Sequence, residues 1–143
     1  MSVVKGLRAE GKLVAQTKAY DFASYTHCIC SNEKVFLKRN RWCSTQKIVE
    51  AVDEIAVYVD LANYINIKKS LPPEIYKQNL ELRKKYQTHA IEISYRVETL
   101  MEIAYRDNNR EGRHIEDDKI NYWIGLLLEL RSQIRKWRDS EQG

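Results

Sequence analysis

The clearest feature of this sequence is a set of apolar stripes whose members recur every three or four residues. The most regular stripe lies over residues 48–65, and acidic residues fall between its members. Steps of three and four place side chains on one face of an α-helix, so this stripe predicts an amphipathic helix. Its members are Ile48, Ala51, Val52, Ile55, Ala56, Val59, Ala62 and Ile65.

Three further segments have a helical period. Residues 12–32 carry a face that polar residues interrupt, whereas residues 74–107 and 115–138 carry regular seams with alternating steps of three and four. Such seams are typical of helices that pack along one another. The two seams consist of Leu82, Tyr86, Ala90, Ile93, Val97, Leu100 and Ala104, and of Ile120, Trp123, Leu127, Leu130, Ile134 and Trp137.

The connections between these segments are short. Ser44 or Thr45 is expected to cap the second helix, Pro72 and Pro73 suit the first turn of the third, and residues 107–112 are expected to form the last turn. The pattern predicts an all-α fold, an up-down-up-down antiparallel four-helix bundle over residues 12–140, after a flexible arm at residues 1–11. The third helix, roughly 50 Å long, is expected to project or bend at its N-terminal end.

The composition agrees with one ordinary globular domain. The chain has 143 residues, of which 43% are hydrophobic and 31% charged, with only 5 Gly and 2 Pro. Three Cys and no secretory leader argue against a disulfide framework, and no apolar run is long enough to cross a membrane. We therefore expect a cytoplasmic protein with reduced thiols.

The sequence offers little to a catalytic or metal-binding function. Its one Glu-x-x-His, Glu111 to His114, contains a glycine and falls in an expected turn. It has no glycine-rich phosphate loop and no zinc-type spacing of Cys and His. We expect neither an enzyme nor a bound metal or cofactor.

Binding through positive charge is the stronger expectation. The net charge is +4, and the Lys and Arg residues gather in three places: residues 34–47, residues 68–85 and residues 131–138. In the predicted bundle the second and third groups share one end and the first lies at the other, so a long RNA is able to contact both. Each group alone is also consistent with simple solvation. The candidate contact residues are Lys34, Lys38, Arg39, Arg41, Trp42, Lys47, Lys68, Lys69, Lys84, Lys85, Arg131, Arg135, Lys136 and Arg138.

Two of these candidates have a structural alternative. Trp42 is able to stack on a base, but a tryptophan in a connection more often packs the connection onto the end of the bundle. Lys47 falls in the first turn of the expected second helix, where the helix dipole disfavours a cation. That cost is expected if Lys47 serves an anionic partner, and it is equally consistent with a solvated lysine.

The stretch FLKRNRWCSTQKIVEAVDEI resembles the entry to the second helix in the accessory variability determinant proteins of diversity-generating retroelements. The matching positions are Phe36, Lys38, Arg41, Trp42, Lys47 and Ile48, and Leu37 stands where that family usually has Pro. The stretch YWIGLLLELRSQIRKWRDS at residues 122–140 is similar to the last helix of the family. The resemblance covers about residues 12–140.

The resemblance implies a small basic four-helix bundle that is not an enzyme and that assembles as a homopentamer. It also implies two partners, the reverse transcriptase of the element and its template RNA, whose copying into mutagenic cDNA the protein supports. Lys38, Arg39, Arg41 and Lys47 are the first contact candidates by position.

Two alternatives stay open. The ribosomal-RNA intervening-sequence protein family shares the entry to the second helix, but the continuation KIVEAVDEIAVYVDLAN lacks the further Arg, Ser and Glu-Gly that this family has. A protein-interaction scaffold, in which the charges serve only solvation, is the other alternative.

Overall fold

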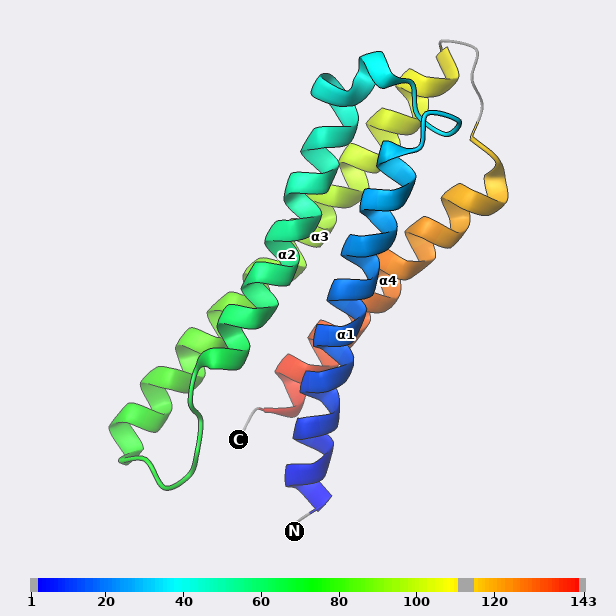
Figure 1. Cartoon of the computed structure of the whole chain (residues 1–143). Coiled ribbons are helices and arrows are strands. Elements are labelled where there is room, and N and C mark those ends of the chain that lie inside the picture. Colours follow the sequence, from blue (N-terminus) through cyan, green and yellow to red (C-terminus); the bar gives the residue numbers. More distant parts are fainter. Residues whose placement is uncertain (1–2, 111–114, 142–143) are drawn as a thin grey trace.

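The chain folds into four long helices. The computed structural model describes residues 3–110 and 115–141, with side chains from residue 14 onward. The described part contains no strand, which confirms the all-α class and a helical bundle (Figure 1). The helices are α1, Val3–Ser31; α2, Gln46–Tyr64; α3, Pro73–Arg110; and α4, Asp117–Ser140.

Side-chain contacts show which parts of the helices lie side by side. Within each pair of neighbouring helices, residue numbers rise along one helix as they fall along the other. The C-terminal end of α1, the start of α2 and the end of α3 lie together at one end of the molecule in Figure 1. The contact pairs are Gln16–Asp60 and His27–Asp53, Lys18–Glu129 and Thr26–Trp123, Glu54–Arg96 and Tyr58–Tyr86, and Thr88–Arg138 and Glu98–Arg131.

The core is made by the stripes that the sequence predicts. The stripe of α2 is buried from Ile48 to Ala62 apart from the half-buried Ala56, and every member of the α4 seam is buried. Fully burying one such aliphatic or aromatic side chain stabilises the fold by roughly 1.5–3 kcal/mol. These two helices therefore contribute much of the free energy that holds the bundle together.

Several boundaries differ from the prediction. The backbone of α1 begins at Val3 rather than near residue 12, and the flexible arm stays a prediction. Pro73 opens α3 as expected, but α3 continues to Arg110, so the first residues of the expected turn at 107–112 are helical. The remainder of that turn and the motif Glu111 to His114 lie outside the described residues.

Thr45 does precede the first residue of α2, but the capping hydrogen bond expected of Ser44 or Thr45 is absent. Ser44 and Thr45 lie inside helical backbone that starts at Lys38, with a 3-10 turn over Lys38–Asn40 and a π-helical turn over Arg41–Thr45. The Ser44 hydroxyl lies 3.3 Å from Asp107 Oδ2 of α3, and the Thr45 hydroxyl lies 3.4 Å from the Arg41 carbonyl oxygen, so neither accepts a hydrogen bond from the backbone of α2.

The N-terminal half of α3 also departs from its predicted seam. Leu82 is 41% exposed, whereas Arg83 and Gln87 are buried. Arg83 pairs with Glu141 at 2.6 Å, and Gln87 Nε2 donates a hydrogen bond to the same carboxylate at 2.9 Å. Arg83 also donates to the Ile65 carbonyl oxygen at 3.1 Å. This buried cluster joins the end of α4 to α3 and to the end of α2.

We expect the Glu141→Ala variant to lose about 3 kcal/mol of unfolding free energy. The substitution leaves the Arg83 guanidinium buried without its carboxylate, and removing one partner of a buried pair is strongly destabilising. Asp139→Ala is the matched control, because the pair between Asp139 and Arg138 is largely exposed and should cost less than about 1 kcal/mol. Urea unfolding followed by circular dichroism measures both, and equal midpoints would contradict the prediction.

Candidate nucleic-acid interface

The first group of cations lies where the chain passes from α1 to α2. We call Lys34, Lys38, Arg39, Arg41, Trp42 and Lys47 the basic edge. Its connection is fixed by two buried side chains, Val35 and Phe36. The ring of Phe36 meets Trp123 of α4 edge-on at 5.9 Å, and Asn108 of α3 donates a hydrogen bond to the Val35 carbonyl oxygen at 3.0 Å. The connection is therefore held by both α3 and α4.

The π-helical turn decides which side chains of the basic edge face solvent. In this turn the Gln46 N–H donates to the Arg41 carbonyl oxygen, five residues earlier. Ser44 and Thr45 are turned inward and buried, while Arg41 and Trp42 are exposed. Single π-helical turns occur often at functional sites.

All five cations of the basic edge are exposed, and Trp42 is 76% exposed. No ion pair within residues 14–110 and 115–141 involves Lys34, Lys38, Arg41 or Lys47. The expectation that Trp42 packs against the end of the bundle is wrong. An exposed aromatic side chain among uncompensated cations is the arrangement that a nucleic acid or another polyanion fits.

The helix dipole acts on Lys38 and Arg39 rather than on Lys47. Helical backbone begins at Lys38, so Lys47 lies well inside it, and Lys38 and Arg39 occupy the first turn. No acidic residue is present in that turn. A cation near a helix N-terminus costs roughly 0.3–1 kcal/mol, so this end tolerates an unfavourable charge that an anionic partner would neutralise.

The second group of cations lies around the connection between α2 and α3. Lys68 and Lys69 are exposed in that connection, and Lys85 is exposed on α3, while Lys84 is half-buried. In Figure 1 this connection lies at the opposite end of the molecule from the basic edge.

The third group, on α4, is only partly available. Arg131 is 6% exposed, donates to Ser94 Oγ at 2.7 Å and to Glu98 Oε1 at 2.7 Å, and stacks on the ring of Tyr95. It belongs to the interior of the structure, because hydrogen bonds and a ring face occupy its guanidinium, and the prediction of it as a contact residue is corrected. Nothing in its spacing distinguished it from its exposed neighbours.

The other members of the third group remain at the surface. Arg135 is exposed and hydrogen-bonded to Tyr95, and Lys136 is exposed. Arg138 donates to Thr88 Oγ1 of α3 at 3.2 Å, one helical turn from Lys84. Arg138 therefore lies near Lys84 of the second group, as expected, whereas the connection that carries Lys68 and Lys69 diverges from α4 (Figure 1).

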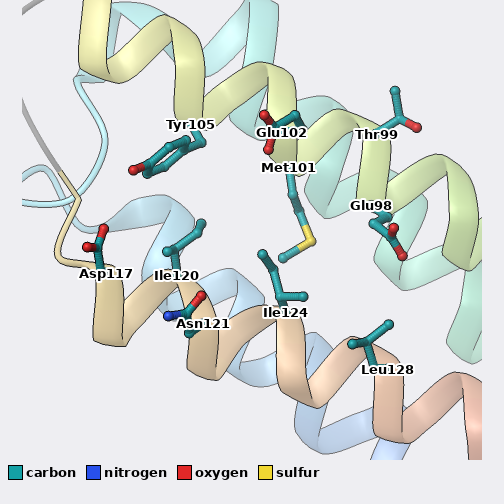
Figure 2. A pocket seen from close by; sticks show the side chains of 10 residues that line it. All are labelled: Glu98, Thr99, Met101, Glu102, Tyr105, Asp117, Ile120, Asn121, Ile124 and Leu128. Atoms are coloured by element: carbon teal, nitrogen blue, oxygen red, sulfur yellow. The ribbon is translucent and has the colours of Figure 1, made fainter.

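A groove between α3 and α4 is not indicated by any pattern in the sequence. Its volume is about 580 Å³, and its lining includes three acids, Glu98, Glu102 and Asp117, and no cation. Figure 2 shows Met101 of α3 reaching toward Ile124 of α4, with Glu98 and Asp117 near opposite ends. We call this site the α3–α4 groove. Its apolar floor and acidic rim suit a cationic apolar segment.

A second unforeseen surface is the far end of the α2–α3 hairpin, residues 63–82, which we call the α2–α3 tip. No residue of the tip is buried, and the end of the hairpin diverges from α1 and α4 in Figure 1. Tyr64, Ile75 and Leu82 are 77%, 45% and 41% exposed. Exposed apolar side chains at the end of a hairpin are a candidate interaction surface. The tip agrees with the expectation that the third helix projects.

Candidate groups for metal binding or acid–base chemistry are sparse. Among the residues whose side chains are described, no group of three His, Cys, Asp or Glu lies close enough to hold a metal ion. His27 pairs with Asp53 at 2.6 Å, and Tyr20 donates to Asp60 at 2.7 Å, which raises the pKa of the Tyr20 hydroxyl. None of the described helices is long and apolar enough to cross a membrane.

Comparisons with family models, with curated proteins and with solved structures found no match to this chain.

The three cysteines should differ in reactivity. All are free thiols; Cys28 and Cys43 are exposed, whereas burial raises the pKa of Cys30 to about 12. The thiolate is the reactive form, so iodoacetamide at pH 8 should alkylate Cys30 at least about tenfold more slowly than the other two. Intact-mass and peptide mass spectrometry measure the rates. Urea-unfolded protein, which should take three adducts quickly, is the control, and equal rates in the folded protein would contradict the prediction.

Proposed function

We propose that this chain is a non-catalytic, cytoplasmic accessory protein of a diversity-generating retroelement, which binds the reverse transcriptase and the template RNA and supports mutagenic cDNA synthesis. The observation that carries the proposal is the basic edge. Lys34, Lys38, Arg41 and Lys47 flank the exposed Trp42 in the sequence, are exposed themselves, and have no ion-pair partner among the residues with described side chains. Lys and Arg neutralise phosphates, and an exposed indole stacks on unpaired bases.

The positions that resemble the retroelement family divide into two kinds. Phe36 and Ile48 are 2% and 0% exposed and hold the chain to the core. Lys38, Arg41 and Trp42 stand between them and face solvent. Buried anchors alone would account for a shared fold. Exposed cations at the matching positions support a shared partner with negative charge.

The proposal includes an up-down-up-down antiparallel arrangement of the four helices. It is supported by the opposite numbering in the contacts of every neighbouring pair of helices and by the grouping of helix ends in Figure 1. This topology separates the basic edge from Lys68 and Lys69 by the length of α2. A single RNA that contacts both ends would lie along the side of the bundle.

The proposed affinity for RNA can be tested through its salt dependence. We expect wild type to bind a structured RNA with an affinity that falls steeply with salt, as fluorescence anisotropy measures. Each phosphate contact contributes about −0.7 to −0.9 to the slope of log affinity against log salt. The double variant Lys38→Glu, Arg41→Glu should therefore bind at least about tenfold more weakly, with a slope reduced by roughly 1.5.

The control for this experiment is Arg96→Glu. Arg96 is an exposed cation in the middle of α3, paired with Glu54 at 3.5 Å, so its reversal alters the net charge of the chain without touching the basic edge. It should bind RNA nearly as wild type does. The proposal fails if wild type shows no salt-dependent binding, or if the double variant and the control bind equally.

Self-assembly is a further part of the proposal, with a homopentamer as the expected form. It is supported by two complementary surfaces at different places on the molecule. The α2–α3 tip carries exposed Ile75 and Leu82 among Lys68, Lys69 and Lys77, and the α3–α4 groove offers an apolar floor with an acidic rim. Docking of the tip of one copy in the groove of the next is a head-to-tail contact, which closes into a ring when the rotation between copies permits.

Mixing two interface variants tests this arrangement. Ile75→Glu alters the tip and Leu128→Lys alters the groove, and each variant alone should be monomeric by analytical ultracentrifugation. A mixture of the two retains one intact tip and one intact groove, so it should form dimers and nothing larger. Val57→Lys, an exposed apolar position of α2 outside both surfaces, should assemble as wild type does. A monomeric wild type, or variants that assemble fully, would refute the contact.

A protein-interaction scaffold is the second candidate function, because the α2–α3 tip exposes apolar side chains whatever the role of the basic edge. A bundle of the ribosomal-RNA intervening-sequence type is a related alternative on the resemblance of the helix entry. Charge reversal at Lys38 and Arg41 separates the scaffold from the main proposal, since a scaffold whose charges serve only solvation loses no function from it.

A further inference from the structure

A small pocket lies behind the basic edge, between the end of α1 and the start of α2. Its volume is about 240 Å³. The residues from α1 that line it include His27, Cys30 and Ser31, and those from the π-helical turn and α2 include Arg41, Gln46 and Val49. Arg41, a cation of the basic edge, therefore also lines this pocket.

The pocket has an apolar floor and a polar rim. Cys30 is 8% exposed and Val49 is half-buried beside it, so the floor presents a thiol and two methyl groups. A buried thiol behaves as a small apolar group. The rim carries the exposed Arg41 and, on α2, Gln46, whose Nε2 donates to Glu50 at 3.1 Å and whose Oε1 remains as an acceptor. A planar ligand with apolar faces and polar edges fits both the apolar floor and the polar rim.

We propose that this pocket takes one unpaired base of an RNA strand whose phosphates lie on the basic edge. The inference rests on the proposed RNA-binding function and adds a base-binding site to it. The volume is below the 300–1,000 Å³ of pockets for drug-sized ligands, so it suits a single ring system. Single-stranded bases are bound by stacking on aromatic rings or on the plane of an Arg guanidinium, with their edges hydrogen-bonded.

The geometry of the turn places two such stacking groups next to each other. Arg41 lines the pocket, and Trp42, the following residue, is exposed outside it. A base in the pocket stacks on the Arg41 guanidinium, and a neighbouring base stacks on the indole. Lys38 and Lys47 then contact the flanking phosphates. Bases within a duplex are stacked on one another and are excluded from the pocket.

The test uses short, unstructured RNA in which each base in turn is replaced by an abasic sugar. Anisotropy titrations with wild type should show two neighbouring sensitive positions, one of which belongs to Trp42 and is lost in Trp42→Ala. At the other, the pocket position, loss of the base should weaken binding about tenfold, the amount expected for one stacked base. The salt slope should stay the same, because every phosphate is retained.

Filling the pocket should remove the sensitivity to an abasic sugar at the pocket position. Val49→Phe places a ring over the floor of the pocket. This variant should bind intact RNA as weakly as wild type binds the RNA that lacks the pocket base, and its salt slope should equal that of wild type. Ser31→Leu narrows the rim from an exposed position of α1 and provides a second variant without altering the core. Val57→Phe makes the same substitution as the first variant at an exposed site of α2 outside the pocket and should bind and discriminate as wild type does.

The possible failures are distinguishable. If wild type binds RNA with a steep salt slope but tolerates abasic sugars at every position except the one that belongs to Trp42, the pocket inference is overturned and the RNA-binding function stands. If the sensitivity to an abasic sugar at the pocket position persists in both Val49→Phe and Ser31→Leu, the pocket is not its source and the inference is overturned. If wild type binds no RNA at all, the proposed function fails and the pocket inference fails with it.

Discussion

The structure depends on the environment of one side chain, the indole of Trp123. It is fully buried, and its Nε1 donates a hydrogen bond to Thr26 Oγ1 of α1 at 3.0 Å. The Thr26 hydroxyl in turn donates to the Phe22 carbonyl oxygen at 2.7 Å, so the buried polar groups satisfy one another. The ring of Phe36 packs edge-on against the indole. This one contact joins α4 to α1 and to the anchor of the basic edge, so the position of the candidate interface follows from the packing of the core.

The positive residues of this chain serve two purposes that composition does not separate. Arg83 and Arg131 are buried, and each pairs with a carboxylate and faces an aromatic ring. Arginine suits such sites because its planar guanidinium binds a carboxylate and stacks on a ring at the same time. Lysines, which are compact and strongly hydrated cations, remain at the surface at Lys38 and Lys47. The number of cations at the surface is therefore smaller than the composition suggests.

Much of the fold, and less of the site, could be predicted from the sequence. The stripes of α2 and α4 were read correctly because apolar periodicity reports burial directly. The predicted seam of α3 is wrong at Leu82. Arg83 and Gln87 are buried in its place, because both bind the carboxylate of Glu141, which lies far away in sequence. The cap at Ser44 failed for a similar reason, since its hydroxyl contacts Asp107 of α3. Local patterns do not show which polar residues find a buried partner, and such partners decide which members of a charged cluster face solvent.

The basic edge combines features that are individually unfavourable for folding. Cations occupy the first helical turn, the backbone widens into a π-helical turn, and the side chain of Trp42 is exposed to solvent. A local arrangement of this kind persists only where the surrounding structure over-determines it, and Val35 and Phe36 supply that support. The result is a cationic and aromatic surface on a helical backbone that the core holds in place. The cations extend from a helical backbone whose torsions are already fixed. A bound polyanion therefore restricts fewer rotatable bonds of the protein than it would on a flexible loop. The loss of entropy on binding is smaller for that reason. This preorganisation gives the unfavourable local features a use, and it is the physical reason to seek the function of this chain at the junction of α1 and α2.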